Sequence, residues 1–201
     1  MQEIISRKEL EELMKTKGEI RGVLLKTDAQ FIIKEKGVEG LKKVEEETKK
    51  LGHPLTYDKI ETMVFYPVGL KTLSLLVIKR VFAFSDEKIK EMGIYVPKFS
   101  WFLRMFIEKF FVRKDVFFNQ VPKFWRKLST GGEFIPIEFN EKKRELSFQI
   151  RGTEIHPIYC PYLVGVFTSI MKMLTKSENV TCEETKCPFA GDEYYEFLIK
   201  W

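Results

Sequence analysis

The spacing of hydrophobic residues changes near the middle of this chain, at Gly131-Gly132. Before that point hydrophobic residues recur at helical spacing in several segments, and after it they alternate with polar residues as they do in strands. The alternation runs over 134–139, stops at a polar turn over 140–143 and returns over 146–150, which predicts a β-hairpin. The chain therefore joins a helical part to an antiparallel β part.

The N-terminal half is expected to be helical. Ser6 and Glu9 form a capping box that predicts a short leader helix within residues 1–17. Glycine and proline then divide the sequence into further helical segments. These are expected over 19–36, 38–50, 70–84, 86–92, 98–112 and 115–127. Phenylalanine and tryptophan are concentrated in the last two, which predicts an interior rich in aromatic rings.

The last third of the chain predicts a second hairpin. A helix over 161–176 is followed by strands near 179–185 and 193–201. This order predicts an α+β fold in which a helical N-terminal half packs on a four-stranded antiparallel sheet, made of two hairpins with an intervening helix. Because no segment resembles a linker, we expect one domain over 1–201, with 130–201 as its core region.

Composition limits the partners of the chain. Charged residues interrupt every apolar stretch before it reaches the roughly 18 residues that a membrane span needs, so we expect no span. The acidic, helix-patterned N-terminus differs from a secretion signal, which favours a cytoplasmic location. The net charge of +5 arises from 34 basic and 29 acidic residues that are interspersed. Such a surface suits solvent better than direct contact with nucleic acid.

All three cysteines lie in the last quarter of the chain, with one glutamate among them. Cys160 precedes Pro161, so we expect it at the N-cap of a helix, where the helix dipole favours a thiolate. Cys182 and Glu184 are two apart in a predicted strand and share a face, and Cys187 follows in the turn. Sulfur and carboxylate ligands suit tetrahedral zinc better than magnesium or calcium. The alternative is that these cysteines are small buried hydrophobic residues.

The same segment resembles the C-terminal signature of the vinyl-4-reductase (4VR) domain family. The resemblance is carried by Cys160, Gly165, the Glu184-Thr-Lys-Cys187 motif and Gly191-Asp192. More loosely, the helices over 20–52 resemble the haem nitric-oxide-binding and Golgi transport-particle superfamily, to which 4VR domains are related. The specific match is confined to the C-terminal segment, whereas the looser match covers most of the chain.

The resemblance implies a structural zinc close to an aromatic-lined pocket, with Cys160, Glu184 and Cys187 as ligands. The final cysteine of the family falls on Tyr195 in this chain. Cys182 shares a strand face with Glu184 and is our candidate for the missing ligand. We therefore expect a zinc site made of Cys160, Cys182, Glu184 and Cys187. Four protein ligands leave no open position, so this zinc is expected to be structural.

We expect no haem, despite the distant relationship. The chain has only two histidines, His53 and His156, and lacks the Tyr-x-Ser-x-Arg propionate motif of the haem-binding relatives. His156 stands before Pro157, a position more typical of a structural or surface histidine than of a ligand.

In sensory relatives the helices before the metal site enclose a small hydrophobic ligand, which implies a pocket in the aromatic middle of this chain. Aromatic rings at helical spacing are also typical of a core or a dimer interface, and that alternative stays open. The candidate ligand-binding residues are Phe99, Trp101, Phe102, Phe106, Phe117, Phe118 and Trp125, with His156, Tyr159 and Tyr162 as polar contacts.

Three hypotheses for the function follow. The first is a cytoplasmic, sensor-like 4VR domain with a structural zinc, which binds a small hydrophobic or aromatic molecule, forms a homodimer and acts through a separate partner. The second is an enzyme or accessory protein acting on a vinyl-bearing tetrapyrrole, although the chain has no glycine-rich nucleotide fingerprint. The third is a dimeric assembly module. No residue can be given a catalytic role, so we expect a binding protein rather than an enzyme.

Overall fold

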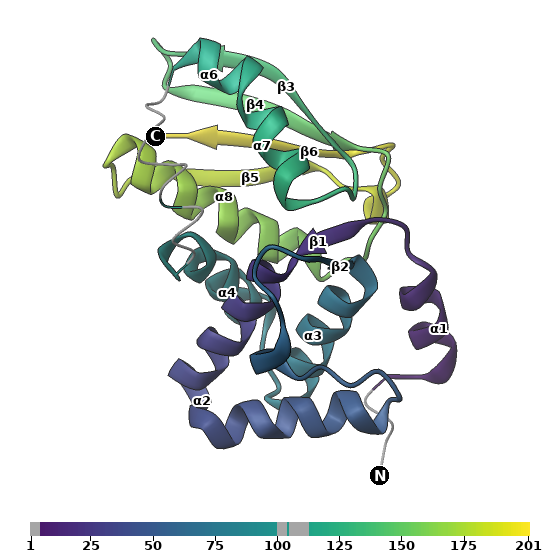
Figure 1. The fold of residues 1–201 in the computed structure, drawn as a ribbon. Coiled ribbons are helices and arrows are strands. Elements are labelled where there is room, and N and C mark those ends of the chain that lie inside the picture. Colours follow the sequence, from purple (N-terminus) through teal and green to yellow (C-terminus); the bar gives the residue numbers. More distant parts are fainter. Residues whose placement is uncertain (1–4, 100–103, 105–112) are drawn as a thin grey trace.

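The computed structural model describes residues 5–99, 104 and 113–201. Helices α1 to α4, within residues 7–99, form one end of the molecule, and a four-stranded antiparallel sheet, within residues 133–200, forms the other, with α8 (Tyr159–Thr175) between them (Figure 1). The expected α+β fold class is thus confirmed, including a helical N-terminal half and a sheet made of two hairpins with an intervening helix. No helix among the described residues has both the length and the apolar character needed to cross a membrane.

The helical end begins with α1, which Ser6 caps as expected: its side chain accepts a hydrogen bond of 3.2 Å from the Glu9 N–H. Two differences follow. Residues 19–21 form a short strand rather than a helix start, and α2 continues through Gly37, where one residue with φ of 70° marks a kink. The elements here are α1 (Arg7–Lys15), β1 (Glu19–Arg21), α2 (Gly22–Lys50), the 3-10 turn η1 (Tyr57–Lys59), β2 (Phe65–Pro67), α3 (Val68–Val81) and α4 (Asp86–Phe99).

A buried ion pair joins α2 and α3. Lys71 and Asp28 are 1% and 2% exposed, and the Lys71 ammonium group donates to one carboxylate oxygen of Asp28 and to the Leu24 carbonyl oxygen. The other carboxylate oxygen accepts a 2.7 Å hydrogen bond from Ser74, whose oxygen is 2.7 Å from the Tyr57 hydroxyl. The pair is therefore neutralised and hydrogen-bonded within the helical core.

Helix α4 crosses α8 at very short range, and two glycines permit this. A Cβ atom on Gly93 would lie 2.0 Å from the Tyr162 carbonyl oxygen, and one on Gly165 would lie 2.0 Å from that of Lys90. The prediction that Gly93 ends a helix is wrong for this reason: α4 continues past it to Phe99. The expected helix over 98–112 falls almost entirely outside the described residues.

The C-terminal end follows the predicted order with shifted boundaries. The helix expected over 115–127 is two helices, separated at Gln120, and Pro122 lies in the first turn of the second. The N-cap of α8 is Ile158 rather than Cys160, which lies within its first turn. The elements are α6 (Lys114–Asn119), α7 (Val121–Leu128), β3 (Glu133–Asn140), β4 (Glu145–Arg151), α8 (Tyr159–Thr175), β5 (Thr181–Lys186), the 3-10 turn η2 (Pro188–Ala190) and β6 (Tyr195–Lys200).

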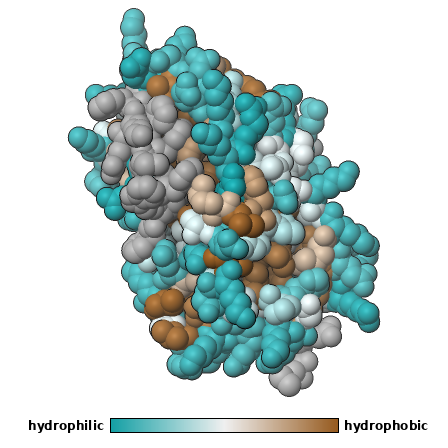
Figure 2. Space-filling view, in the orientation of Figure 1, coloured by the Kyte–Doolittle hydropathy of each residue, from teal (hydrophilic) through white to brown (hydrophobic). Residues whose placement is uncertain are grey.

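The sheet has the strand order β3-β4-β6-β5, and every neighbouring pair is antiparallel. Its inner face carries an aromatic cluster centred on Phe148, whose ring lies 4.4 Å from that of Phe134 and 4.7 Å from that of Phe167 in α8. These contacts fix α8 against the sheet. On the surface, hydrophilic residues cover most of the face in Figure 2, and hydrophobic ones gather near its middle, where β1 and β2 lie in Figure 1.

Candidate functional site

An apolar cavity of about 190 Å³ lies between the inner face of the sheet and helices α6, α7 and α8. Its wall combines Phe117 of α6, Trp125 of α7 and Phe167 of α8 with Phe134 and Phe148 of the sheet. The sheet contributes because alternate residues of β3 and β4 point inward. The cavity is therefore formed by side chains of the packed core and is lined mainly by carbon atoms.

Polar side chains that border the cavity direct their polar atoms elsewhere. The Lys71 ammonium group is held by Asp28, and the Trp125 indole N–H donates to the Gly132 carbonyl oxygen at 3.0 Å. The hydroxyl groups of Tyr159 and Tyr162 are buried and have no hydrogen-bond partner among the described residues. Burial raises the pKa of both tyrosines, so both hydroxyls stay protonated. The rings, rather than the hydroxyls, form the wall.

The structure places the expected pocket residues as follows. Phe117, Trp125, Tyr159 and Tyr162 line the cavity, whereas Phe118 packs beside Phe117 at a ring distance of 5.3 Å and is not part of the lining. The side chain of Phe99, and residues Trp101, Phe102 and Phe106, lie outside the described part of the chain.

His156 also lies away from the cavity. Its Nδ1 atom accepts a hydrogen bond of 3.1 Å from the Ile158 N–H, and its surroundings include Glu9 and Arg80. Burial lowers the pKa of His156; Glu9 opposes this shift, and Arg80 reinforces it. The side chain therefore stabilises the start of α8 in its neutral form.

Sequence reasoning did not identify the contribution of the sheet to the cavity. Phe134, Phe148 and Tyr195 line it from three different strands. Their period-two spacing did predict an inward face. It did not indicate that this face borders an empty volume, which depends on how helices far away in the sequence pack across it.

Three of the four expected metal ligands lie together beside this cavity. The Sγ atoms of Cys160 and Cys187 are 3.4 Å apart, and one ligand atom each from Cys160, Glu184 and Cys187 lie within 4.8 Å of one another. The cluster joins the first turn of α8 to the end of β5. A loop closes it, because the Cys187 N–H donates to the Asp192 carboxylate at 2.9 Å.

Burial and mutual repulsion determine the protonation of this cluster. Burial raises the pKa of Cys160, and the neighbouring thiol and carboxyl groups raise it further. Burial also raises the pKa of Glu184, and its hydrogen bonding with the Cys160 and Cys187 thiols opposes that shift. The Oε1 atom of Glu184 has no hydrogen-bond partner among the described residues. Without a cation these groups repel as anions and favour their protonated forms. A bound metal ion would reverse that preference, since cysteine and carboxylate bind metals as anions.

Cys182 does not join the cluster. It lies opposite Ile199 in the strand register, and its side chain neighbours Thr168. Thr168 is eight residues beyond Cys160 in α8, which corresponds to about 12 Å along the helix axis. Burial raises the pKa of the Cys182 thiol to about 12, so this side chain is a protonated thiol. The structure therefore brings together Cys160, Glu184 and Cys187, and leaves Cys182 outside.

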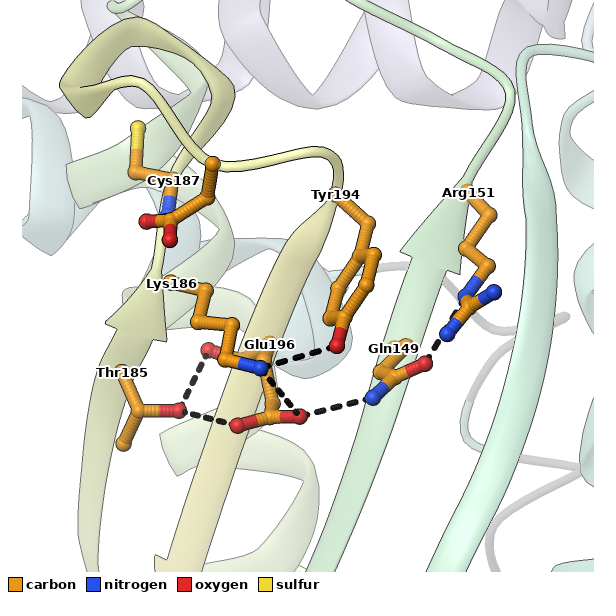
Figure 3. Close-up of polar contacts among 8 residues, drawn as sticks. Gln149, Arg151, Thr185, Lys186, Cys187, Tyr194 and Glu196 are labelled. Carbon is orange, nitrogen blue, oxygen red and sulfur yellow. Dashed lines mark hydrogen bonds and ion pairs between the residues drawn. The ribbon is translucent and has the colours of Figure 1, made fainter.

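A polar network on the outer face of the sheet supports the strand end that carries Cys187 (Figure 3). Glu196 of β6 accepts from Gln149 of β4 at 2.7 Å and from Thr185 of β5 at 3.0 Å. Lys186 donates to the Tyr194 hydroxyl at 2.8 Å. These bonds connect three adjacent strands, so the strand end beside the cluster is held in place.

Comparison with known proteins identifies the fold. No family model matches the chain, and no curated protein matches it in sequence. Solved structures of H-NOX proteins cover 90% of this chain. The H-NOX protein from S. oneidensis in its Fe(II)NO ligation state has a TM-score of 0.66 at 8% identity and is covered to 98% of its length.

Two further structures agree. A mutant of the H-NOX protein from K. algicida, in its Fe(II) unliganded state, has a TM-score of 0.61 at 11% identity, with 96% of its chain covered. A structure concerned with haem redox potential and protein-induced porphyrin distortion has a TM-score of 0.59 at 17% identity, with all of its chain covered. The looser resemblance to the haem nitric-oxide-binding superfamily is thus confirmed as a likeness of fold.

This finding corrects our expectation of zinc without haem. Proteins of this fold include ones concerned with haem, so two histidines and a missing propionate motif were insufficient grounds to exclude it. The described cavity lining nevertheless contains no histidine or cysteine, and its volume is below the roughly 300–1,000 Å³ of typical ligand pockets. Tyr159, Tyr162 and Tyr195 do line the cavity, and tyrosine is a residue type that binds haem iron in some proteins, so the lining does not exclude haem.

Proposed function

We propose that this chain is a small-molecule-binding, sensor-like domain of the 4VR type, whose ligand is small and hydrophobic or aromatic and occupies the cavity between the sheet and helices α6 to α8. The observation that carries the proposal is the apolar cavity of about 190 Å³. An engineered cavity of about 150 Å³ with similar walls stays dry and binds benzene or xenon. The size therefore suits a single aromatic ring or a smaller apolar molecule.

The proposal includes a structural zinc held by Cys160, Glu184 and Cys187. Two sulfurs at about 2.3 Å from a tetrahedral zinc ion lie about 3.8 Å apart, whereas two sulfurs in a disulfide lie about 2.05 Å apart. The observed separation of 3.4 Å is close to the zinc-bound value. Such a metal would fix the start of α8, which forms part of the cavity wall.

Fluorobenzene binding tests the ligand proposal directly. We expect saturable binding of fluorobenzene to the purified protein, measured by ¹⁹F NMR. Binding is favourable because it transfers the apolar ring from water to an apolar cavity. The variant Val166→Phe adds volume to a cavity-lining position of α8 and is expected to abolish binding. Val38→Phe is the matched control, since Val38 is 56% exposed on α2 and far from the lining. Equal binding by both variants would contradict the cavity as the site.

Metal analysis tests the zinc proposal separately. We expect one zinc per chain in the wild-type protein, and loss of that zinc in Cys160→Ser and in Cys187→Ser. Metal content that is unchanged in both variants would contradict the site.

Haem is the second candidate for the cavity, and the H-NOX-like fold supports it. A titration with hemin, followed in the Soret region, separates the two candidates. A saturable complex with one haem per chain, and loss of fluorobenzene binding in that complex, would make haem the occupant. Saturable fluorobenzene binding with only non-stoichiometric hemin association supports the small apolar ligand.

The homodimer and the tetrapyrrole enzyme complete the set of proposals. Native mass spectrometry is expected to give a dimer that retains a small molecule. A tight dimer without any ligand supports the assembly module instead. Turnover of a divinyl tetrapyrrole with a nicotinamide donor would support the enzyme.

A further inference from the structure

The cluster offers three ligands, whereas tetrahedral zinc takes four, and a buried hydroxyl lies on the same side of the sheet. Tyr195 is 1% exposed, and its hydroxyl oxygen has no hydrogen-bond partner among the described residues. The Glu184 Oε1 atom is likewise buried without a hydrogen-bond partner among the described residues. An unpaired buried polar atom costs about 1–3 kcal/mol, so two of them beside a pair of thiols indicate a missing partner.

The strand register brings Tyr195 toward this cluster. Glu184 lies opposite Phe197, and Tyr195 is two residues before Phe197, so all three side chains share the inner face of the sheet. The direction of β6 places Tyr195 on the side of Glu184 where β5 ends and Cys187 follows. A register irregularity between Glu184 and Lys186 turns Cys187 inward at the same end. Burial raises the pKa of Tyr195, and the neighbouring Cys160, Cys187 and Glu184 raise it further, whereas the Ile155 backbone lowers it.

The same register moves Cys182 away. Cys182 lies opposite Ile199, on the far side of Glu184 from Cys187. Two residues along a strand correspond to about 6.6 Å. One metal ion with ligand bonds of about 2.0–2.3 Å cannot reach Cys182 and Cys160 together without moving the strand or the helix.

We propose that Tyr195 supplies the fourth ligand, so that Zn²⁺ is held by two sulfurs from Cys160 and Cys187 and two oxygens from Glu184 and Tyr195. This inference rests on the proposed zinc site. Binding replaces the protons of both thiols, of the phenol and of any protonated carboxyl group, and these protons pass to solvent. The resulting site has the same net charge as a four-cysteine zinc site. It also gives a partner to each of the two unpaired oxygens.

A metal ligand at Tyr195 would connect the metal centre to the cavity. The Tyr195 side chain lines the cavity as well as facing the cluster. A metal ion bound by its oxygen would fix the orientation of a ring in the cavity wall. The metal centre and the ligand cavity thus share one residue.

Zinc affinity in metal-free protein tests the inference, with Co²⁺ as the spectroscopic probe. We expect Tyr195→Phe to weaken zinc binding roughly tenfold or more, since even groups that only support ligands change affinity about 10–100-fold. It should also change the visible spectrum of the Co²⁺ form. We expect Tyr195→Cys to restore tight binding, and Cys182→Ser to bind as the wild type does. Phenylalanine preserves the ring, so the metal-free variant is expected to remain folded, which circular dichroism checks.

The outcomes are distinguishable. Wild-type affinity and an unchanged Co²⁺ spectrum in Tyr195→Phe would overturn Tyr195 as a ligand while leaving the zinc proposal intact. Weaker zinc binding in Cys182→Ser would identify Cys182 as the fourth ligand and would also overturn the proposal for Tyr195. Failure of the wild-type protein to bind zinc or Co²⁺ would refute the zinc proposal itself.

Discussion

The crossing of α4 and α8 can be tested by replacing Gly165 with alanine, because helix propensity and the close contact between the two helices change stability in opposite directions. Replacing Gly165 by alanine raises intrinsic helix stability by about 1 kcal/mol, because glycine is the weaker helix former. In this structure the added Cβ atom would lie 2.0 Å from the Lys90 carbonyl oxygen and 3.0 Å from the Ile94 nitrogen. Both are backbone atoms of α4 and cannot rotate away. The helices must therefore separate, and the variant is expected to be less stable.

The size of the effect follows from the geometry. Ordinary contact begins at 3.4 Å, so the crossing must open by about 1.4 Å at this point. Overpacking a well-packed interior costs about 1–3 kcal/mol, and a clash between backbone atoms belongs at the upper end. After subtracting the helix preference, we expect Gly165→Ala to lower the free energy of unfolding by about 2 kcal/mol. For a chain of this length that corresponds to a decrease of about 4–8 °C in melting temperature.

Urea denaturation measures this difference, with the m-value as a check on two-state behaviour. Gly131→Ala is the matched control, because its Cβ atom would meet Ser129 at 3.4 Å and Ile155 at 3.7 Å, which are ordinary contacts. We expect that control to change stability by less than about 1 kcal/mol. A Gly165→Ala protein as stable as the wild type would refute the close crossing, and with it the position of α8 against the cavity.

Two further predictions concern buried titratable groups. Lys71→Met leaves the Asp28 carboxyl group buried without its partner, so we expect the free energy of unfolding, measured in urea, to fall by about 3–5 kcal/mol. The double variant Lys71→Met with Asp28→Leu is expected to recover most of this loss. A single variant as stable as the wild type would contradict the pairing of Asp28 with Lys71. The pKa of His156 is lowered by folding, so the unfolded chain binds more protons near that pKa and stability rises with pH there. The free energy of unfolding is thus expected to decline as pH falls from about 6.5 through the lower pKa of folded His156. This decline should be smaller in His156→Gln. An identical pH profile in that variant would show that other groups cause the pH dependence of stability.

Local patterns in the sequence predicted the elements that local physics determines. The Ser6 capping box, the alternation on both sides of the turn at 140–143 and the helix after Pro161 all correspond to observed elements. Gly93 was misread for an equally physical reason. A glycine within a helical pattern signals either an end or a close contact with another helix, and only the position of Tyr162 distinguishes them.

The residues of the candidate site also differ in how far the sequence could predict them. Cys160, Glu184 and Cys187 were predicted as a group from the resemblance to the 4VR signature, which combines a cysteine at the start of a helix with a Glu-x-x-Cys motif at the end of a strand, and the structure brings their side chains together. Cys182 could not be separated from them, since residues two apart on a strand share a face whichever helix lies opposite. The role proposed for Tyr195 depends on the strand register and on an irregularity near Lys186, neither of which the sequence specifies.

The most direct test of the central claim is a crystal structure of the protein under xenon pressure. Xenon is apolar and enters dry cavities that are large enough to hold it. The account predicts xenon density inside the cavity bounded by Phe117, Phe148 and Phe167. Ordered water in that volume, or side chains packed together with no space for xenon, would contradict an apolar ligand cavity as the functional site of this chain.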